Sequence, residues 1–432
     1  MSNKEAGSAP EPRAHEPAQH TEQRGAEDRT SGRNTAVLVS FTALTNLADG
    51  VLKISLPLIA TRITESPAQI ALVAMSLSLP WLLTALHVGV MVDRFDRRRL
   101  VWIANLMRLG AMTWLITALL SDTITLTLIY TAGAVLGVAE VIAMTSIASL
   151  VPAAVRPAKR QRANAWVAGA ETACSEFTGP FLGGLLMALG ASIALGATAI
   201  GYAIGILTLL LLIGRFTPDF DRSNPTTGVH ERIAEGLRFL WNHRLLRGMA
   251  ALMVVLAATW GAWLALMPLV AKTMMGLSDQ EYGILLSALG AGGIIGALSV
   301  SWINRMVGQR WAMLLDLLGT AAMVAAPALT TNLWIVSIAA FMGGMGGTLW
   351  AVNTRTISQR LVPSGMLGRY NSAARLFSWG AMPLGAGLVG VLAEFIGIQA
   401  AFGLFALASL LMIIPFFRTV TPQALAEVPE YR

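Results

Sequence analysis

The chain has 432 residues, of which 55% are hydrophobic and only 13% are charged. Its mean hydropathy is +0.62, and so few polar residues cannot cover a water-soluble surface. This composition excludes an ordinary soluble domain and indicates a membrane protein. The formal net charge of +7 would suit a nucleic-acid-binding protein, but the positions of the basic residues give another explanation.

Hydrophobic runs long enough to cross a bilayer, about 20 residues each, recur twelve times in the sequence. We therefore predict an all-α membrane protein with twelve transmembrane helices. The predicted spans are 35–61, 68–92, 100–120, 124–151, 164–187, 189–213, 248–271, 281–304, 311–330, 333–358, 371–395 and 398–417.

Basic residues are distributed unevenly between the loops that join these spans. Loops after even-numbered spans carry clusters such as 94–99 and 156–162, whereas loops after odd-numbered spans carry little beyond Arg62 and Lys272. Basic residues accumulate on the cytoplasmic side during insertion. The pattern predicts that both termini are cytoplasmic, in a bacterial inner or plasma membrane, and it accounts for the positive charge without nucleic acid.

Polar segments divide the chain into parts. Residues 1–34, rich in Pro, Glu, Ala and Arg, are expected to form a disordered cytosolic tail, and residues 418–432 a second cytosolic tail. The linker 214–247 separates two six-helix halves, 35–213 and 248–417. The second half of the linker has apolar residues on one face and basic residues on the other, which predicts an amphipathic helix at the cytosolic surface.

The first span contains a polar stripe. Thr42, Asn46, Asp49 and Lys53 fall at i, i+4, i+7 and i+11, so they share one face of a helix, which should border a cavity. One interpretation is an Asp49–Lys53 ion pair inside the bundle. The other is that Asp49 binds and releases a proton during transport, because charges inside a membrane usually mark a pathway or relay.

The loop between the second and third spans reads GVMVDRFDRRR. Its Gly89, Asp93, Arg94, Arg97 and Arg98 resemble the signature of the major facilitator superfamily, although an Asp replaces the second Gly of that signature. The resemblance implies that this gating motif forms a charge cluster against the cytosolic end of the eleventh span. The alternative is that the arginines are only topology signals.

Further charges lie in the third to fifth spans. Glu140, Glu171 and Glu176 are additional candidates for proton coupling, and Arg108 is expected to pair with a carboxylate of the fourth or fifth span. Acidic charge in the membrane is thus concentrated in the first half, which favours proton handling there.

The fifth span ends in GPFLGG. Its Gly179, Pro180, Gly183 and Gly184 allow the helix to bend and to approach a neighbour closely, and they resemble the end of the antiporter motif, with Ser175 where a Gly is expected. From 35 to 417 the chain resembles the drug:proton antiporter branch of the superfamily, which includes macrolide-efflux and enterobactin-export proteins. In that branch the first helix carries an acidic residue followed by Gly, as Asp49 is here.

The second half offers candidates for the cavity wall. Besides Arg108, these are Trp260, Trp263, Trp350, Asn353 and Arg355, with Arg355 expected at a cytosolic gate.

The two halves repeat one another. Leu-Val-Pro occurs at 150–152 and again at 361–363, and Gly89 corresponds to Gly296 before the equivalent loop. Two halves of the same orientation are typical of transporters with a site between them at the bilayer midplane and give the pseudo-symmetric major facilitator fold. Chance similarity between Gly- and Pro-rich membrane sequences is the alternative.

Enzymatic and channel functions fit the sequence less well. It contains no phosphate-binding loop and no zinc-protease motif, its five histidines are scattered, and its single cysteine allows no intrachain disulfide. We predict a secondary transporter without metal or cofactor, functional as a monomer, that exports small amphipathic compounds in exchange for protons. Exporters of a siderophore or another endogenous metabolite, and less readily an uptake symporter, are the alternatives.

Overall fold

The computed structural model describes residues 16–214, 216, 229–363 and 366–427, and within these ranges the regular secondary structure is entirely helical. The first half consists of α1 (Glu16–Ala60), α2 (Pro67–Arg94), α3 (Arg97–Leu120), α4 (Leu126–Ala154), α5 (Pro157–Thr172), the π-helix η1 (Ala173–Thr178), α6 (Gly179–Leu189) and α7 (Ala191–Leu209). After α8 (Val229–Asn242), the second half consists of α9 (Arg244–Leu269), the π-helix η2 (Val270–Met274), α10 (Asp279–Val307), α11 (Gln309–Leu329), α12 (Leu333–Leu361), α13 (Leu367–Ser378), α14 (Ala381–Ile396), α15 (Ile398–Leu411) and α16 (Ile413–Thr419), followed by α17 (Pro422–Ala426).

These helices account for all twelve predicted spans. In the part of the chain that is described, 11 helices are long and apolar enough to cross a membrane. The remaining span, predicted at 164–187, is built from α5, η1 and α6 in succession. Each of these segments is too short to cross alone, and together they run without interruption from Pro157 to Leu189.

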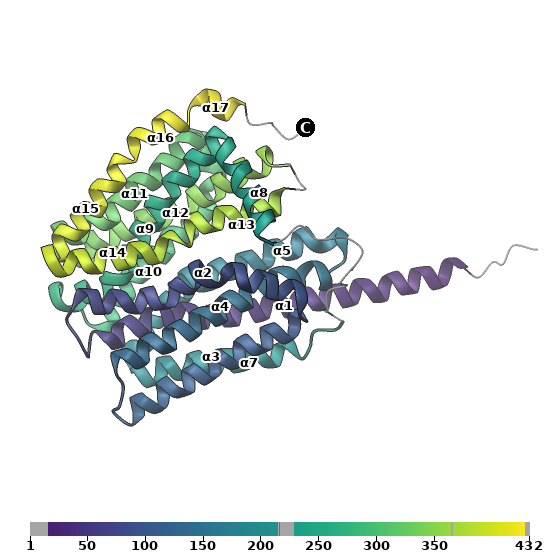
Figure 1. The fold of residues 1–432 in the computed structure, drawn as a ribbon, viewed down its shortest axis with the longest axis horizontal. Coiled ribbons are helices and arrows are strands. Elements are labelled where there is room, and N and C mark those ends of the chain that lie inside the picture. Colours follow the sequence, from purple (N-terminus) through teal and green to yellow (C-terminus); the bar gives the residue numbers. More distant parts are fainter. Residues whose placement is uncertain (1–15, 215, 217–228, 364–365, 428–432) are drawn as a thin grey trace, which may run out of the picture.

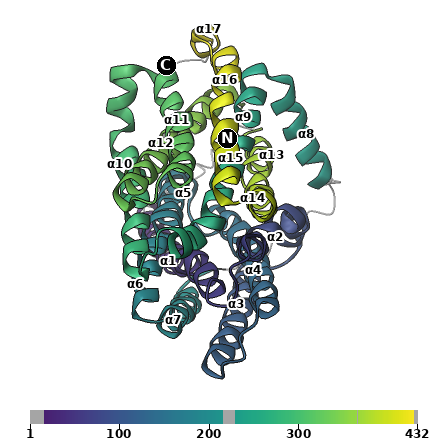
Figure 2. The ribbon, with the colours of Figure 1, turned by 90° about the vertical axis from the view of Figure 1, so that its left-hand side faces the viewer.

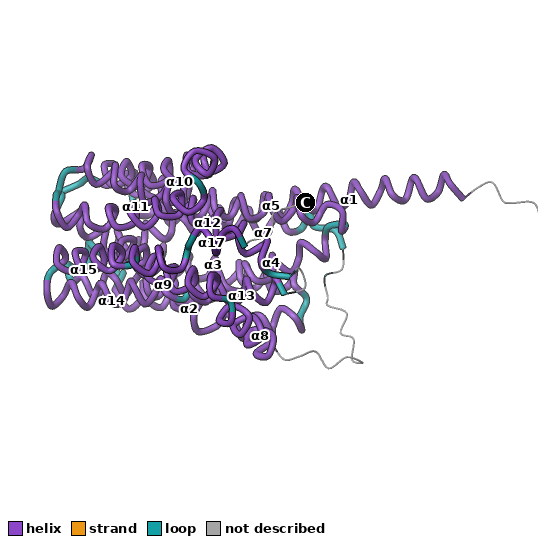
Figure 3. The backbone as a smooth tube through the Cα atoms, turned by 90° about the horizontal axis from the view of Figure 1, so that it is seen from above, coloured by secondary structure: helices purple, strands orange, loops and turns teal. Residues whose placement is uncertain are grey.

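The two halves form two lobes that lie against each other along their length (Figures 1 and 2). Helices α1 to α7 make one lobe and α9 to α16 the other, while α8 lies along the edge of the second lobe (Figure 3). Twelve crossings bring the start of α1 and the end of α16 to the same end of the bundle, which we call the terminal end. The far end carries the turns after α1, α3, α6, α9, α11 and α14.

The first helix begins earlier than the predicted first span. The helix begins at Glu16, inside the segment expected to form a disordered tail, and residues 1–15 lie outside the described part. The side chain of Asn34 is buried and donates to the carbonyl oxygens of Ala154 (3.1 Å) and Ile213 (2.9 Å). A polar residue of the segment expected to form a tail therefore hydrogen-bonds the backbone at the terminal ends of α4 and α7. The other tail, 418–432, contains α17.

The linker contains the predicted amphipathic helix as α8, which packs on α13. Glu235 of α8 forms an ion pair with Arg369 of α13, and a Cβ at Gly236 would overlap the Arg369 carbonyl oxygen. Leu240 is fully buried in an apolar cluster of the second half. The apolar side of α8 is thus covered by protein, whereas its location at the membrane surface stays a prediction.

Contacts between the halves join the far part of the bundle. From the far end toward the middle, they are Ser66 Oγ with Glu394 Oε2 (2.8 Å), Arg62 Nη2 with Asp279 Oδ2 (3.3 Å), the close approach of Gly184 to Gly283, and the rings of Trp81 and Trp379 (5.4 Å between centroids). The far side of the bundle is therefore closed. The space between the halves lies toward the terminal end.

Candidate functional site

Asp49 is buried in the first half and both of its carboxylate oxygens are hydrogen-bonded. Arg108 Nη2 of α3 donates to Oδ2 at 2.8 Å, and the hydroxyl of Tyr202 of α7 donates to Oδ1 at 2.6 Å. The guanidinium also lies 5.0 Å from the centroid of the Tyr202 ring. Arg108 and Asp49 are only 1% and 5% exposed, so their charges compensate each other away from water, which is the condition under which buried ions are tolerated.

This arrangement differs from the expected pairing of Arg108. The sequence suggested a carboxylate from the fourth or fifth span, but the partner comes from the first span. In the fold α7 packs against both α1 and α3, which brings Tyr202 and Arg108 to the same carboxylate. Tyr202 was not among the predicted residues, and its position as a polar ring in an apolar span is the only signal that the sequence offers.

Lys53 does not form the ion pair with Asp49 that was one of the two interpretations. Its ammonium bonds Glu140 Oε1 of α4 at 3.2 Å and Ser175 Oγ of η1 at 3.1 Å. It also lies 5.8 Å from the ring centroid of Trp379, in the other half. Ser175, the departure from the antiporter motif, thus supplies a hydrogen-bond acceptor for a cation in the membrane.

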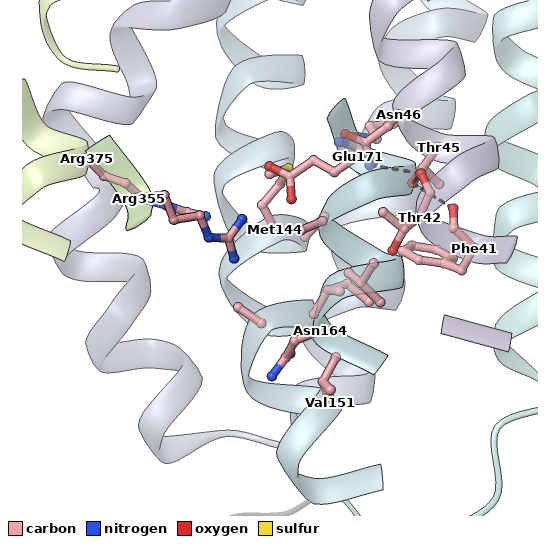
Figure 4. A pocket seen from close by; sticks show the side chains of 16 residues that line it. Phe41, Thr42, Thr45, Asn46, Met144, Val151, Asn164, Glu171, Arg355 and Arg375 are labelled. Atoms are coloured by element: carbon pink, nitrogen blue, oxygen red, sulfur yellow. Dashed lines mark hydrogen bonds between the residues drawn. The ribbon is translucent and has the colours of Figure 1, made fainter. Parts of the chain in front are cut away.

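A cavity of about 240 Å³ lies between the halves on the terminal side of these charges. Figure 4 shows Glu171 of α5 and Arg355 of α12 pointing into it from opposite halves. Thr42 and Asn46, members of the predicted stripe, form its wall on α1. The lining residues are Phe41, Thr42, Thr45, Asn46, Arg108, Ala143, Met144, Ile147, Ala148, Val151, Asn164, Val167, Ala168, Glu171, Arg355 and Arg375.

The structure brings some predicted residues to this cavity and leaves others elsewhere. Arg108 and Arg355 line it, whereas Trp263, Trp350 and Asn353 are buried outside it, and Asn353 Oδ1 accepts a hydrogen bond from Asn304 Nδ2 at 2.8 Å. The ring of Trp260 packs against Gly347. Arg375 lines the cavity but was not predicted, although a basic residue near the start of an apolar span was visible in the sequence.

The gating motif at the end of α2 is only partly described. The side chains of Asp93 and Glu176 lie outside the described residues, so the expected charge cluster stays a prediction. Arg94 is exposed, Arg97 and Arg98 are half-buried, and Gly89 has open space beside it. Asp96, which replaces a Gly of the family signature, caps α3: its Oδ1 accepts from the Arg99 amide at 3.0 Å, and its φ of −59° needs no glycine.

The glycines of the fifth span lie where helices approach one another. A Cβ at Gly179 would lie 2.7 Å from Gly50 Cα of α1, and Gly183 faces Val51 of the same helix. Gly184 instead faces the second half, where a Cβ would lie 2.6 Å from Gly283 Cα. The π-helix η1 ends at Thr178, just before Gly179 and Pro180, and the bend itself stays a prediction. A π turn suits a position where proline, which has no amide hydrogen, interrupts the α-helical pattern.

Two six-helix halves, closed on one side and enclosing a cavity with buried charges behind its wall, define a secondary transporter of the alternating-access type. Among the described residues no cluster of His, Cys, Asp and Glu is arranged to hold a metal ion. Comparison with known proteins then identifies the family.

A family model described as "Transmembrane secretion effector" matches residues 35–429. The chain belongs to this family of the major facilitator superfamily, and it is a membrane transporter rather than an enzyme. It is similar to the multidrug efflux pump Tap of Mycolicibacterium fortuitum, with 29% identity over 395 residues that cover 88% of this chain and 94% of that protein. It is also similar to the enterobactin exporter EntS of Escherichia coli, with 28% identity over 408 residues that cover 90% and 94% of the two chains.

Solved structures share the fold at lower identity. A bacterial homologue of the human lysosomal transporter Spinster superposes with a TM-score of 0.70 at 13% identity, covering 92% of this chain and 99% of that chain. The nucleoside transporter NupG superposes with a TM-score of 0.66 at 12% identity, covering 90% and 98%. These likenesses confirm the predicted major facilitator fold.

Proposed function

We propose that this protein exports small amphipathic compounds across a bacterial cytoplasmic membrane in exchange for protons. The observation that carries the proposal is the buried Asp49–Arg108–Tyr202 network directly behind the cavity wall. Arg108 belongs to both: it binds Asp49 and it lines the cavity. A proton that binds Asp49 therefore changes the charge next to the space that would hold the substrate.

The terminal end is the cytoplasmic end in this proposal. It carries the clusters of basic residues around the turns after α2, α4 and α10, most of them in the helix ends that flank each turn, as the insertion preference for basic residues favours. The cavity lies toward that side and the far side is closed, so the structure corresponds to an inward-facing state. Both halves of the cavity wall come from one chain, which supports a functional monomer.

Transport proceeds by rocking of the first half against the second. With Asp49 charged, Arg108 and Tyr202 hold α1, α3 and α7 together as the structure shows. Protonation of Asp49 weakens this network and leaves the Arg108 charge without its counter-ion, which a buried site tolerates poorly. The charged and protonated forms thus prefer different packings, and substrate binding is linked to proton binding through that difference.

Two substrate classes follow from the relatives. Similarity to the multidrug efflux pump Tap supports export of drugs, and similarity to the enterobactin exporter EntS supports export of a siderophore or another endogenous metabolite. The identities of 29% and 28% are nearly equal, so sequence similarity alone favours neither class.

The test is substrate-driven proton movement in liposomes that contain the purified protein and a pH-sensitive dye. Drugs, dyes and siderophores are added to wild type and to Asp49→Asn. Asp316→Asn is the control, because Asp316 is an equally buried carboxylate of the second half that bonds only Thr320 Oγ1, at 3.1 Å, among the described residues.

We expect proton movement in the wild type and in Asp316→Asn, and its loss in Asp49→Asn with substrate binding preserved. Unchanged proton movement in Asp49→Asn would show that the network is structural. Absence of both proton movement and substrate accumulation in the wild type, for every compound, would reject the export function itself.

A further inference from the structure

Two arginines of the second half present unpaired charges to the cavity. Arg355 of α12 and Arg375 of α13 both line it with exposed side chains, and neither guanidinium has a hydrogen bond or ion pair to another described residue. Among the described lining residues the only carboxylate is Glu171, on the opposite wall. Arg108 is already neutralised by Asp49 at 2.8 Å. Two guanidiniums therefore face one carboxylate, and the cavity carries an excess of positive charge.

The wall on α1 presents buried polar atoms without partners. Thr42 Oγ1 and Asn46 Oδ1 have no hydrogen bond to any described residue, although their residues are only 4% and 5% exposed. Asn46 Nδ2 donates to the Thr42 carbonyl oxygen at 2.9 Å, which fixes the carboxamide with its oxygen unused. Buried polar groups are almost always satisfied, so an acceptor left open beside a cavity marks a place for a ligand that donates a hydrogen bond.

Apolar side chains separate these two polar regions. Phe41, Met144 and Ile147 lie in the lining together with other aliphatic groups. The volume of about 240 Å³ is slightly below the usual range for pockets that bind drug-sized molecules, roughly 300 to 1,000 Å³. The occupant therefore has an apolar body between two different polar ends.

We infer that the cavity binds a small amphipathic monoanion. Its carboxylate or comparable acidic group binds Arg355 and Arg375, and a hydroxyl or amide hydrogen at its other end bonds Asn46 Oδ1 or Thr42 Oγ1. Guanidinium is suited to this role because it donates two parallel hydrogen bonds to a carboxylate. The inference names the substrate class for the proposed export function and rests on that function.

The anion and the proton bind to different charged residues. The anion binds arginines of the second half, whereas the charge of Asp49 is matched by Arg108 of the first half. Anion binding therefore does not require protonation of Asp49. Glu171 is the group that competes with the anion, because it faces the same two arginines across the cavity.

The test compares two dyes with the same ring system and opposite charge. At a pH between the pKa values of its carboxyl and phenol groups, fluorescein is a monoanion with a phenolic hydroxyl, and the methyl ester of a rhodamine is a cation. Affinities are measured by fluorescence anisotropy on purified protein in lipid nanodiscs, for wild type, Arg355→Ala, Arg375→Ala and Thr42→Val. The control is Arg305→Ala, which removes an exposed arginine from the last turn of α10, outside the cavity lining.

We expect wild type to bind fluorescein at least tenfold more tightly than the rhodamine ester. Each cavity arginine variant should weaken fluorescein binding about tenfold, equivalent to about 1.4 kcal/mol, without weakening the binding of the cation. Arg305→Ala should change neither affinity. Thr42→Val should weaken fluorescein binding and leave the melting temperature unchanged, because the lost hydroxyl has no partner among the described residues.

Three results would overturn the inference: equal affinity for the two dyes, preference for the cation, or binding of neither. Transport measured in liposomes with the same preparations shows whether only the anion inference fails or whether the proposed export function fails as well. If the cation is expelled from the liposome lumen against its gradient, export stands and only the anionic class is wrong. If neither dye nor any compound of the wider panel is transported, both proposals fail.

Discussion

Tyr202 and Arg108 bind the two different oxygens of one carboxylate, at 2.6 and 2.8 Å from Asp49. The three residues come from α7, α3 and α1, so this small network connects three of the six crossings of the first half. It contains a full positive and a full negative charge without contact to bulk water. The stability of the protein should therefore fall much more when one of these charges is removed than when both are removed.

Replacement of Arg108 by Gln should destabilise the protein strongly. The substitution leaves the Asp49 carboxylate buried without a cation, a situation that typically costs about 3 to 5 kcal/mol. The double variant with Asp49→Asn should recover much of this loss, since it removes both charges. Thermal unfolding in detergent, followed by tryptophan fluorescence, measures the effect. A double variant no more stable than Arg108→Gln alone would contradict this account.

Tyr202→Phe should have a smaller effect. The ring fills the same buried space, and only the hydroxyl that donates to Asp49 is lost. Removal of one partner of a buried hydrogen bond typically costs about 1 to 3 kcal/mol, so the melting temperature should fall by less than in Arg108→Gln. Tyr130→Phe is the control, because the Tyr130 hydroxyl donates to the Gln69 carbonyl oxygen in an exposed setting. Equal losses in the two variants would indicate that burial next to Asp49 adds nothing.

Gly184→Ala should push the two halves apart on the far side. The added Cβ would lie 2.6 Å from Gly283 Cα, a backbone atom that cannot move away alone. We expect the conformational equilibrium to shift away from the state with the far side closed, seen as increased labelling of cysteines introduced near the far end. Gly196→Ala on α7 is the control, since nothing lies within 4 Å of its added methyl group. Identical labelling of both variants would refute a tight contact between α6 and α10.

A disulfide between α2 and α14 should lock the far side shut. A Cβ at Gly390 would lie 2.5 Å from Ala71 Cβ, so a small adjustment brings cysteines at these positions to the usual Cβ separation of about 3.8 Å. The pair is introduced with Cys174→Ser, which removes the only native cysteine. Oxidation should abolish transport while the cavity still binds ligand, and reduction should restore transport. Full transport by the oxidised protein would mean that the far side does not open between these helices.

The sequence predicted the helices well because each span is long, apolar and bounded by polar residues. The span at 68–92, for example, corresponds to α2 at 67–94. The polar stripe of α1 was equally clear, since Thr42, Asn46, Asp49 and Lys53 share a face through helical periodicity alone. The partners of these residues were not predictable. Periodicity gives the face of a side chain but not the neighbouring helix, and three residues 59 to 153 positions apart meet at Asp49.

Other differences have a related cause. Ser31 and Asn34 look like tail residues because they are polar, and only the fold shows that the ends of α4 and α7 offer them backbone groups to bond. Trp263 was a reasonable candidate for a cavity wall, yet it is fully buried in the second half. Arg375 contributes to the cavity although its span was interpreted only as a membrane crossing.

The π-helix η1 changes the directions in which side chains of the fifth crossing point around the helix axis. Each α-helical residue advances by about 100° around the axis, and a π turn accommodates roughly one residue more than an α turn. Side chains after Thr178 are therefore rotated by about that angle from where an unbroken α-helix would place them. Glu171 lies before the π-helix and points into the cavity, whereas Gly184 lies after it and contacts Gly283. The lining of the cavity and the contact between the lobes can thus change independently during evolution, although one continuous helix contributes to both.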